Sequence, residues 1–84
     1  MYRIEVTKRA SKALRRMPAN QRTLVMKKIK AYAEHPDEDL NVIKLVGEDG
    51  YRMRIGDWRV IFDRQDDVLL ILVLEVGPRG GVYQ

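Results

Sequence analysis

YRMRIGDWRVIFD, residues 51–63, is the stretch of sequence that decides the fold. Apolar and polar residues alternate with period two on both sides of Gly56-Asp57, a pattern typical of two strands joined by a tight turn. Residues that face each other in an antiparallel pair point to the same side of the sheet. A two-residue turn therefore gives the hairpin one apolar side, made by pairing Ile55 with Trp58, Met53 with Val60, and Tyr51 with Phe62.

The other side of this hairpin carries Arg52, Arg54 and Arg59, with Arg54 opposite Arg59. Two unit charges ~5 Å apart repel by about 3 kcal/mol at an effective dielectric of about 20. A bound anion would offset this repulsion, and arginine matches phosphate with paired hydrogen bonds. We therefore interpret the three arginines as a phosphate-binding surface. The alternative is a solvated face on which the arginine stems cover Ile61.

The composition bounds the class of protein. With 84 residues, the chain is expected to form one domain, residues 1–84. Without cysteine and with one histidine, it has no disulfide framework, thiolate metal site or multi-histidine site, so we expect neither metal nor cofactor. The apolar run at residues 68–74 is too short to span a bilayer, and no signal peptide is recognisable. We expect a cytoplasmic protein with no membrane partner.

The charge is unevenly distributed along the chain. Residues 1–36 hold ten Lys/Arg and two acidic residues, whereas residues 37–84 hold six Lys/Arg and ten acidic residues. A basic surface of this kind favours nucleic acid or an acidic protein as partner. It is equally typical of a solubilising surface.

The other elements follow from periodicity and from residues that begin or end helices. Residues 2–6 alternate as a strand, and Thr7 is expected to cap a helix with the apolar stripe Ala10, Ala13, Leu14 and Met17. Pro18 ends that helix, and Asn20 is expected to cap a second helix that stops at His35-Pro36. Its inner face is formed by Val25, Ile29, Tyr32 and Ala33.

The second half of the chain is expected to be mostly strand. Residues 40–46 have a mixed pattern that predicts no element, and residues 68–74 predict a strand buried on both faces. The order β-α-α-β-β-β indicates a small α+β domain with an antiparallel-rich sheet packed on a two-helix hairpin. The helices should cover the apolar side of the sheet and leave the arginine side open.

Few residues outside the hairpin suggest chemistry. Arg79 follows the last strand beside Gly80-Gly81, where the backbone can approach a ligand closely. Tyr83 is interpreted, from the residues alone, as a packing anchor. Glu75 is unusual at the end of an apolar strand. We expect it to pair with an arginine of the hairpin face and to orient that arginine rather than to catalyse. His35 at a helix end is interpreted as structural. The acidic residues 37–39 are interpreted as a solvated loop rather than a metal site.

This arrangement resembles the RelE/ParE toxins of bacterial type II toxin–antitoxin modules. The resemblance covers nearly the whole chain and rests on three motifs together: Lys44-Leu45-Val46-Gly47, residues 51–62, and Val76-Gly77-Pro78-Arg79 with the following Val82-Tyr83. It implies the RelE-like fold and a place in the RelE-like mRNA interferase branch. In that branch the enzyme sits in the ribosomal A site, and the RNA 2′-hydroxyl attacks the neighbouring phosphate without metal, giving a 2′,3′-cyclic phosphate.

Carried over position by position, the resemblance implies roles for five residues. The catalytic set is Arg52, Arg54, Arg59, Arg79 and Tyr83, with Tyr83 stacking on a base. We assign contacts with RNA and the ribosome to the basic residues Lys8, Arg9, Lys12, Lys27, Lys28, Lys30 and Lys44. The expected partners are a cognate antitoxin, the ribosome and mRNA, with operator DNA reached only through the antitoxin complex.

One departure from the family pattern concerns the proton acceptor. A lysine on the first hairpin strand is thought to act as general base in the family, but Arg52 and Arg54 occupy both basic positions here. Because arginine stays protonated, the base is unassigned. Two other functions fit the same fold, namely a ParE-like inhibitor of DNA gyrase and a non-catalytic co-repressor that holds its antitoxin on the operator.

Overall fold

The central hairpin has the register that the alternation predicts. The computed structural model describes residues 1–38 and 41–78. Strands β3 (Tyr51–Ile55) and β4 (Trp58–Gln65) pair antiparallel, and every predicted facing pair is present, including Arg54 with Arg59. Gly56 has φ 56°, in the left-handed region that favours a residue without Cβ, and so it allows the two-residue turn.

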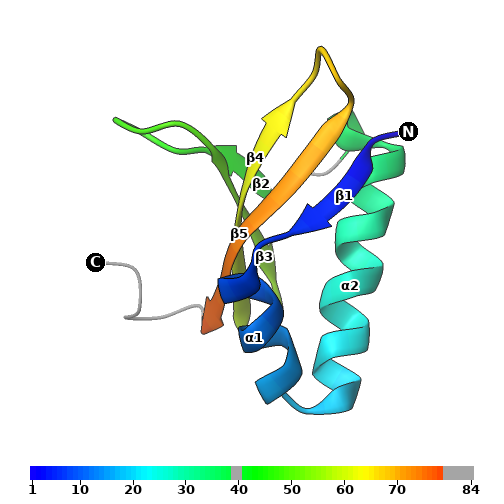
Figure 1. Cartoon of the computed structure of the whole chain (residues 1–84), viewed down its shortest axis with the longest axis vertical. Coiled ribbons are helices and arrows are strands. Elements are labelled where there is room, and N and C mark those ends of the chain that lie inside the picture. Colours follow the sequence, from blue (N-terminus) through cyan, green and yellow to red (C-terminus); the bar gives the residue numbers. More distant parts are fainter. Residues whose placement is uncertain (39–40, 79–84) are drawn as a thin grey trace.

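The hairpin belongs to a five-stranded sheet with the order β1-β5-β4-β3-β2 (Figure 1). β5 (Leu70–Pro78) lies antiparallel to β4, and β1 (Arg3–Val6) pairs parallel with β5. The short β2 (Val42–Lys44) forms the other edge of the sheet beside β3. The predicted α+β class is confirmed, and β2 adds a strand that the sequence pattern did not predict.

Two helices follow β1. Helix α1 (Lys8–Arg16) begins at Thr7, whose Oγ1 accepts a hydrogen bond from the backbone N–H of Ala10, so the predicted cap is confirmed. Asn20 was predicted to cap the second helix, but helix α2 (Ala19–Glu34) already includes it. Pro18 occupies the cap position instead, because its φ of −55° suits the start of a helix and its carbonyl accepts hydrogen bonds from Gln21 and Arg22.

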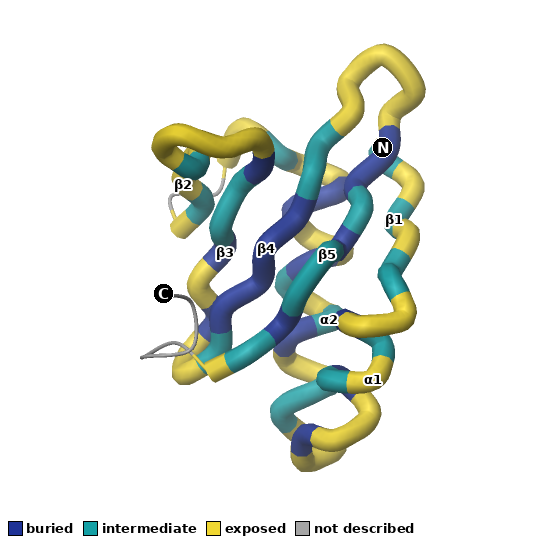
Figure 2. The backbone as a smooth tube through the Cα atoms, turned by 60° about the vertical axis from the view of Figure 1, so that its left-hand side comes forward, coloured by how far each residue is buried: buried dark blue, intermediate teal, exposed yellow. Residues whose placement is uncertain are grey.

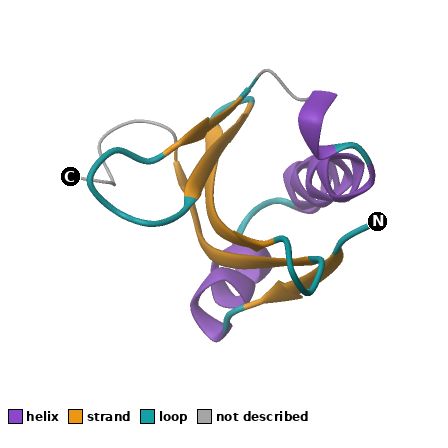
Figure 3. Cartoon of the chain, turned by 90° about the horizontal axis from the view of Figure 1, so that it is seen from above, coloured by secondary structure: helices purple, strands orange, loops and turns teal. Residues whose placement is uncertain are grey.

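The core lies between one side of the sheet and both helices, with α1 alongside β5 (Figures 1 and 3). The predicted inner face of α2 is buried. Among the strands, most of the buried residues belong to β4 and β5 (Figure 2). Phe62 lies at the centre of this core. Its ring is 5.1 Å from that of Tyr32, edge-on, and 5.4 Å from that of Tyr51, stacked, both measured between ring centroids.

The last strand begins later than the continuous apolar run predicts. Val68 and Leu69 belong to the turn that joins β4 to β5, where they are about half exposed. Leu69 has φ 51°, and the backbone N–H of Arg3 donates to its carbonyl oxygen at 2.8 Å. The strand starts at Leu70 and extends through Glu75 to Pro78, beyond the predicted end at residue 74.

A bulge interrupts the pairing of β4 with β5. Ile61 lies opposite Glu75 and Phe62 lies opposite Val73, so Leu74 is an extra residue on β5. The Thr7 hydroxyl donates to the Leu74 carbonyl oxygen at 2.9 Å, which joins the start of α1 to the bulge. Because side chains alternate along a strand, the extra residue places Glu75 on the arginine side of the sheet and Val76 in the core.

A polar cluster closes the end of the core near the β4–β5 turn. Arg64 donates to Asp66 at 2.6 Å and to the Tyr32 hydroxyl at 3.2 Å, and the Tyr2 hydroxyl donates to Asp66 at 2.7 Å. Asp37, in the short 3-10 helix η1 (Pro36–Glu38), lies 3.9 Å from Arg64. The first part of the predicted acidic loop is therefore ordered against this cluster, and Asp39 lies outside the described residues.

Candidate functional site

The arginine side of the sheet consists of two rows of residues that cross three strands. Arg54 on β3, Arg59 on β4 and Gly77 on β5 form the first row. Arg52, Ile61 and Glu75 form the second row on the same strands. Hydrogen-bonded strands fix these backbone positions more rigidly than loops would, so the charged groups are held at set spacings. We call these six residues the arginine face.

The three arginines differ in exposure, so the face is less open than predicted. Arg54 is exposed and Arg52 is half-buried, but Arg59 is only 8% exposed. Ile61 beside Arg59 is also buried. The face is a recess because α1 forms a wall along its β5 side.

Arg52 carries a buried donor without an acceptor. Among the described residues, its Nε has no hydrogen-bond partner, and Arg52 lies between Ile43 on β2 and Ile61 on β4. An unsatisfied buried donor costs about 1–3 kcal/mol.

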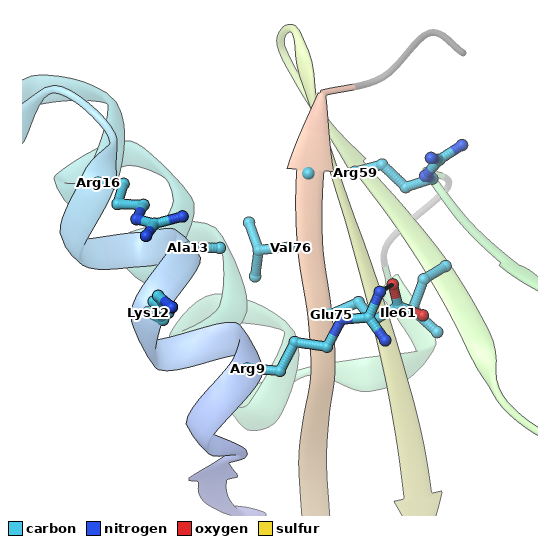
Figure 4. A pocket seen from close by; sticks show the side chains of 9 residues that line it. Arg9, Lys12, Ala13, Arg16, Arg59, Ile61, Glu75 and Val76 are labelled. Atoms are coloured by element: carbon cyan, nitrogen blue, oxygen red, sulfur yellow. Dashed lines mark ion pairs between the residues drawn. The ribbon is translucent and has the colours of Figure 1, made fainter. Parts of the chain in front are cut away.

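A hollow of about 250 Å³ lies between α1 and the β5 side of the arginine face (Figure 4). Its cationic lining comes from both elements: Arg9, Lys12 and Arg16 from α1, and Arg59 from β4. Gly77 lies next to Arg59 in the sheet and has no side chain to fill the space. Four cations around one small hollow make it a suitable site for an anionic group.

Glu75 contributes the one acidic side chain among the residues that line this hollow in the described part of the chain. Its Oε1 lies 3.1 Å from a guanidinium nitrogen of Arg9 (Figure 4). We expected Glu75 to pair with an arginine of the sheet face, and the ion pair that the structure shows is with Arg9 of α1. This ion pair links α1 to β5 at the edge of the arginine face.

The structure brings some of the predicted basic residues to the arginine face and places others elsewhere. Arg9 and Lys12 line the hollow, and Lys8 lies on α1 beside a second depression with Lys12 and Arg15. Lys44 lies opposite Tyr51 and so points to the other side of the sheet. Lys27 and Lys30 line a separate groove of about 480 Å³ along α2, and Lys28 is a half-buried residue of the same helix.

Arg16 is a site residue that the sequence interpretation missed. It follows Arg9 and Lys12 at helical spacing i, i+3, i+7, so the three cations share one side of α1. This spacing was visible in the sequence. The predicted residues Arg79 and Tyr83 lie outside the described residues.

Within residues 1–38 and 41–78, no group of three or more His, Asp or Glu side chains is placed to hold a metal ion. No helix in this part of the chain is long and apolar enough to cross a membrane.

The solved structures most like this one include several toxins. RelE in the archaeal RelE–RelB complex from Pyrococcus horikoshii is 33% identical, with 94% of this chain and 96% of that chain aligned and a TM-score of 0.80. RelE in the intact Escherichia coli RelBE complex is 25% identical, with 93% and 96% aligned and a TM-score of 0.78. A chain of the RelBE2 complex from Mycobacterium tuberculosis, 20% identical, shares the fold with a TM-score of 0.81 over 93% and 98% of the two chains.

The sequence model for the ParE toxin of the type II toxin–antitoxin system parDE matches residues 4–83. The chain belongs to the RelE/ParE toxin superfamily. The sequence model carries the ParE name, whereas the similar structures are RelE toxins. No protein with a curated description matches the sequence significantly. The superfamily membership confirms the resemblance and the fold, and the two names correspond to the two toxin activities considered next.

Proposed function

We propose that this RelE/ParE toxin is a ribosome-dependent endoribonuclease that cuts mRNA and is neutralised by a cognate antitoxin. The observation that carries the proposal is the pairing of Arg54 with Arg59 on rigid strands, next to a cationic hollow. Like charges placed opposite each other destabilise a sheet, so this row is best explained by an anion that binds across it. A polynucleotide provides such anions at regular spacing.

The proposed reaction is an attack by the RNA 2′-hydroxyl on the adjacent phosphate. Arg52, Arg54 and Arg59 would stabilise the extra negative charge that develops on the phosphate oxygens. Removing one such donor from an active site costs about 100–1,000-fold in rate. The product would carry a 2′,3′-cyclic phosphate, and the step needs no metal ion. Arg79 and Tyr83 complete the proposed set, with Tyr83 stacking on a base for about 1–3 kcal/mol.

The Nε of Arg52, which lacks a hydrogen-bond partner among the described residues, supports the binding of a ligand that is rich in hydrogen-bond acceptors. The free protein leaves this buried donor unpaired. Phosphate offers several acceptor oxygens and pairs well with a guanidinium group. Arg52 is half-buried, so a phosphate that it binds would bring acceptor oxygens close to this donor.

The antitoxin is proposed from the similar structures and from exposed apolar surface. The RelE chains from Pyrococcus horikoshii and Escherichia coli were solved as complexes with RelB. In this chain Leu24 is 46% exposed, Ile43 47% and Val46 98%. An antitoxin that folds onto this small domain would cover such residues. The toxin would act in the cytoplasm, where ribosomes are, and would reach operator DNA only within the antitoxin complex.

Inhibition of DNA gyrase is the second candidate function, because the matching sequence model is described as a ParE toxin. A gyrase inhibitor has no need of opposed arginines on the sheet. Substitution on the arginine face therefore separates the two functions.

The experiment expresses three forms without antitoxin: wild type, Arg54→Gln, and Arg3→Gln as a charge-matched control on an exposed residue of β1. For an endoribonuclease, wild type and Arg3→Gln arrest growth and produce new mRNA ends, and Arg54→Gln does neither. For a gyrase inhibitor, all three forms arrest growth with DNA breaks and intact mRNA. The second outcome overturns the proposal.

A further inference from the structure

The proposed cleavage needs a group that accepts the proton of the 2′-hydroxyl, and the arginine face supplies none through its arginines. Guanidinium groups stay protonated in proteins, so Arg52, Arg54 and Arg59 cannot fill this role. Lys44 points to the other side of the sheet. The acceptor must therefore be sought among the other groups that reach the same recess.

Glu75 is a carboxylate placed on the arginine face by a specific backbone feature. Without the extra residue Leu74, alternation would put Glu75 on the core side, opposite the arginines. The bulge reverses this and sets Glu75 beside Ile61 in the second row. β-Bulges often occur next to active sites, where they aim a side chain.

Glu75 is within reach of the group that Arg59 would bind. Because Arg59 pairs with Gly77, Glu75 is a diagonal neighbour of Arg59, at a typical Cα separation of about 7–8 Å that long side chains bridge. Both residues line the hollow of about 250 Å³. A phosphate held by Arg59 above Gly77 would place its attached sugar close to the carboxylate.

Arg9 fixes the position of this carboxylate without enclosing it. The ion pair engages Oε1 at 3.1 Å, and the Glu75 side chain is 33% exposed. A carboxylate can accept hydrogen bonds at both oxygens, so an incoming hydroxyl can also be bound. A partly exposed ion pair of this kind contributes only about 0–1 kcal/mol to stability, so a role in stability alone explains little of its placement.

We propose that Glu75 is the general base of the cleavage reaction, which makes this inference dependent on the proposed function. The 2′-oxygen forms a bond to phosphorus while its proton passes to the Glu75 carboxylate. The bond between phosphorus and the 5′-oxygen breaks, and that oxygen takes a proton from solvent. Glu75 then returns its proton to solvent. No electrons are exchanged with another reactant, so the step balances as a transesterification.

The test is single-turnover cleavage of mRNA on programmed ribosomes by wild type, Glu75→Gln and Glu75→Asp. Asp67→Asn is the charge-matched control, since Asp67 is exposed in the β4–β5 turn. Loss of a general base typically costs about 100–10,000-fold. We expect the cleavage rate of Glu75→Gln at saturating ribosome concentration to be at least ~100-fold below that of wild type. The ribosome concentration that gives half of the maximal rate should change little. Glu75→Asp should recover part of the rate, and Asp67→Asn should match wild type.

Two further readouts separate a base from other roles. A substrate with sulfur in place of the bridging 5′-oxygen has a good leaving group and needs no acid, so a base variant stays slow on it. The acidic limb of the wild-type pH–rate profile should disappear in Glu75→Gln and persist in Arg9→Gln. If the sulfur substrate restores Glu75→Gln, or if the two variants share one profile, Glu75 is not the base.

Failure of this inference is distinguishable from failure of the proposed function. If wild type leaves ribosome-bound mRNA intact, the proposed function is wrong and the inference fails with it. If wild type cleaves and Glu75→Gln cleaves at the same rate, only the inference is overturned. Binding of Glu75→Gln to ribosomes that carry a 2′-deoxy substrate should equal that of wild type, because the carboxylate acts on a group absent from that substrate.

Discussion

At the scale of single residues, Arg52 is expected to lower the stability of the fold while it contributes to the proposed cleavage of mRNA. Its buried Nε lacks an acceptor, while its stem lies between Ile43 and Ile61. Arg52→Met keeps an apolar stem and removes both the orphan donor and one positive charge. We expect the free energy of unfolding to rise by about 1 kcal/mol, as relief of an unsatisfied group allows. Cleavage of mRNA should fall about 100-fold.

Urea unfolding monitored by Trp58 fluorescence measures the stability part of this prediction. Arg3→Met is the control, because it removes an exposed arginine of β1 and should change stability by less than about 0.5 kcal/mol. A drop of more than 1 kcal/mol in Arg52→Met would show that the guanidinium group stabilises the free protein.

The cluster around Arg64 makes stability depend on pH. Hydrogen bonds from Tyr2 and Arg64 lower the pKa of Asp66. The Asp66 carboxylate therefore stabilises the fold above its unfolded pKa of about 3.9, and this stabilisation is lost as pH falls through the lower folded value. The hydrogen bond to Asp66 raises the pKa of Tyr2, and burial raises that of Tyr32. Their contribution is present below about pH 10 and is lost at higher pH.

Melting temperatures measured from pH 2 to pH 11 check this dependence. We expect a plateau between about pH 5 and 9 with losses on both sides. Asp66→Asn should flatten the acidic side, whereas Asp67→Asn, at an exposed neighbour in the same turn, should keep it. An unchanged acidic slope in Asp66→Asn would mean that other carboxylates cause the loss.

At the scale of elements, Thr7 holds α1 against the bulge of β5. Its Oγ1 accepts from the Ala10 N–H at 3.2 Å and donates to the Leu74 carbonyl oxygen at 2.9 Å. Thr7→Val keeps the shape and loses both hydrogen bonds. We expect a loss of about 2 kcal/mol, from about 1 kcal/mol for the cap and a similar amount for the carbonyl left unpaired.

Thr7→Ser is the matched control, since serine retains the hydroxyl and should stay within about 0.5 kcal/mol of wild type. Thermal unfolding of both variants measures the difference. Equal stability of Thr7→Val and Thr7→Ser would show that packing, and not the two hydrogen bonds, holds the helix start.

The elements differ in how far the sequence predicts them, for physical reasons. The register of the β3–β4 hairpin was predictable to the residue because its period-two pattern is long and Gly56 marks the turn. The end of β4 was not, since Arg64 and Gln65, expected in a turn, extend the strand. β2 was not, because three residues show no period and gain their strand conformation by pairing with β3. The bulge at Leu74 was also hidden, since an apolar run looks the same with one residue more or fewer. Glu75 appeared out of place for that reason.

At the scale of the whole molecule, the sheet separates two surfaces. One side packs against α2 and the apolar residues of α1 to form the core, and the other carries the arginine face, which the cationic residues of α1 border along β5. The sequence predicted this layering and the three arginines of the face. The sequence did not predict which basic residues of the helices lie near these arginines, because that depends on how each helix packs on the sheet. Arg9, Lys12 and Arg16 line the hollow beside the arginine face, whereas Lys27 and Lys30 lie along α2.

The chemistry of the new 3′ end of mRNA tests the central claim most directly. Purified toxin is added to ribosomes programmed with one mRNA, and the cut position and the terminal group are determined. We predict a cut within the A-site codon that leaves a 2′,3′-cyclic phosphate, and a rate at least ~100-fold lower for Arg59→Ala. Intact mRNA after incubation with folded, antitoxin-binding wild type would contradict the claim, as would equal cleavage by Arg59→Ala.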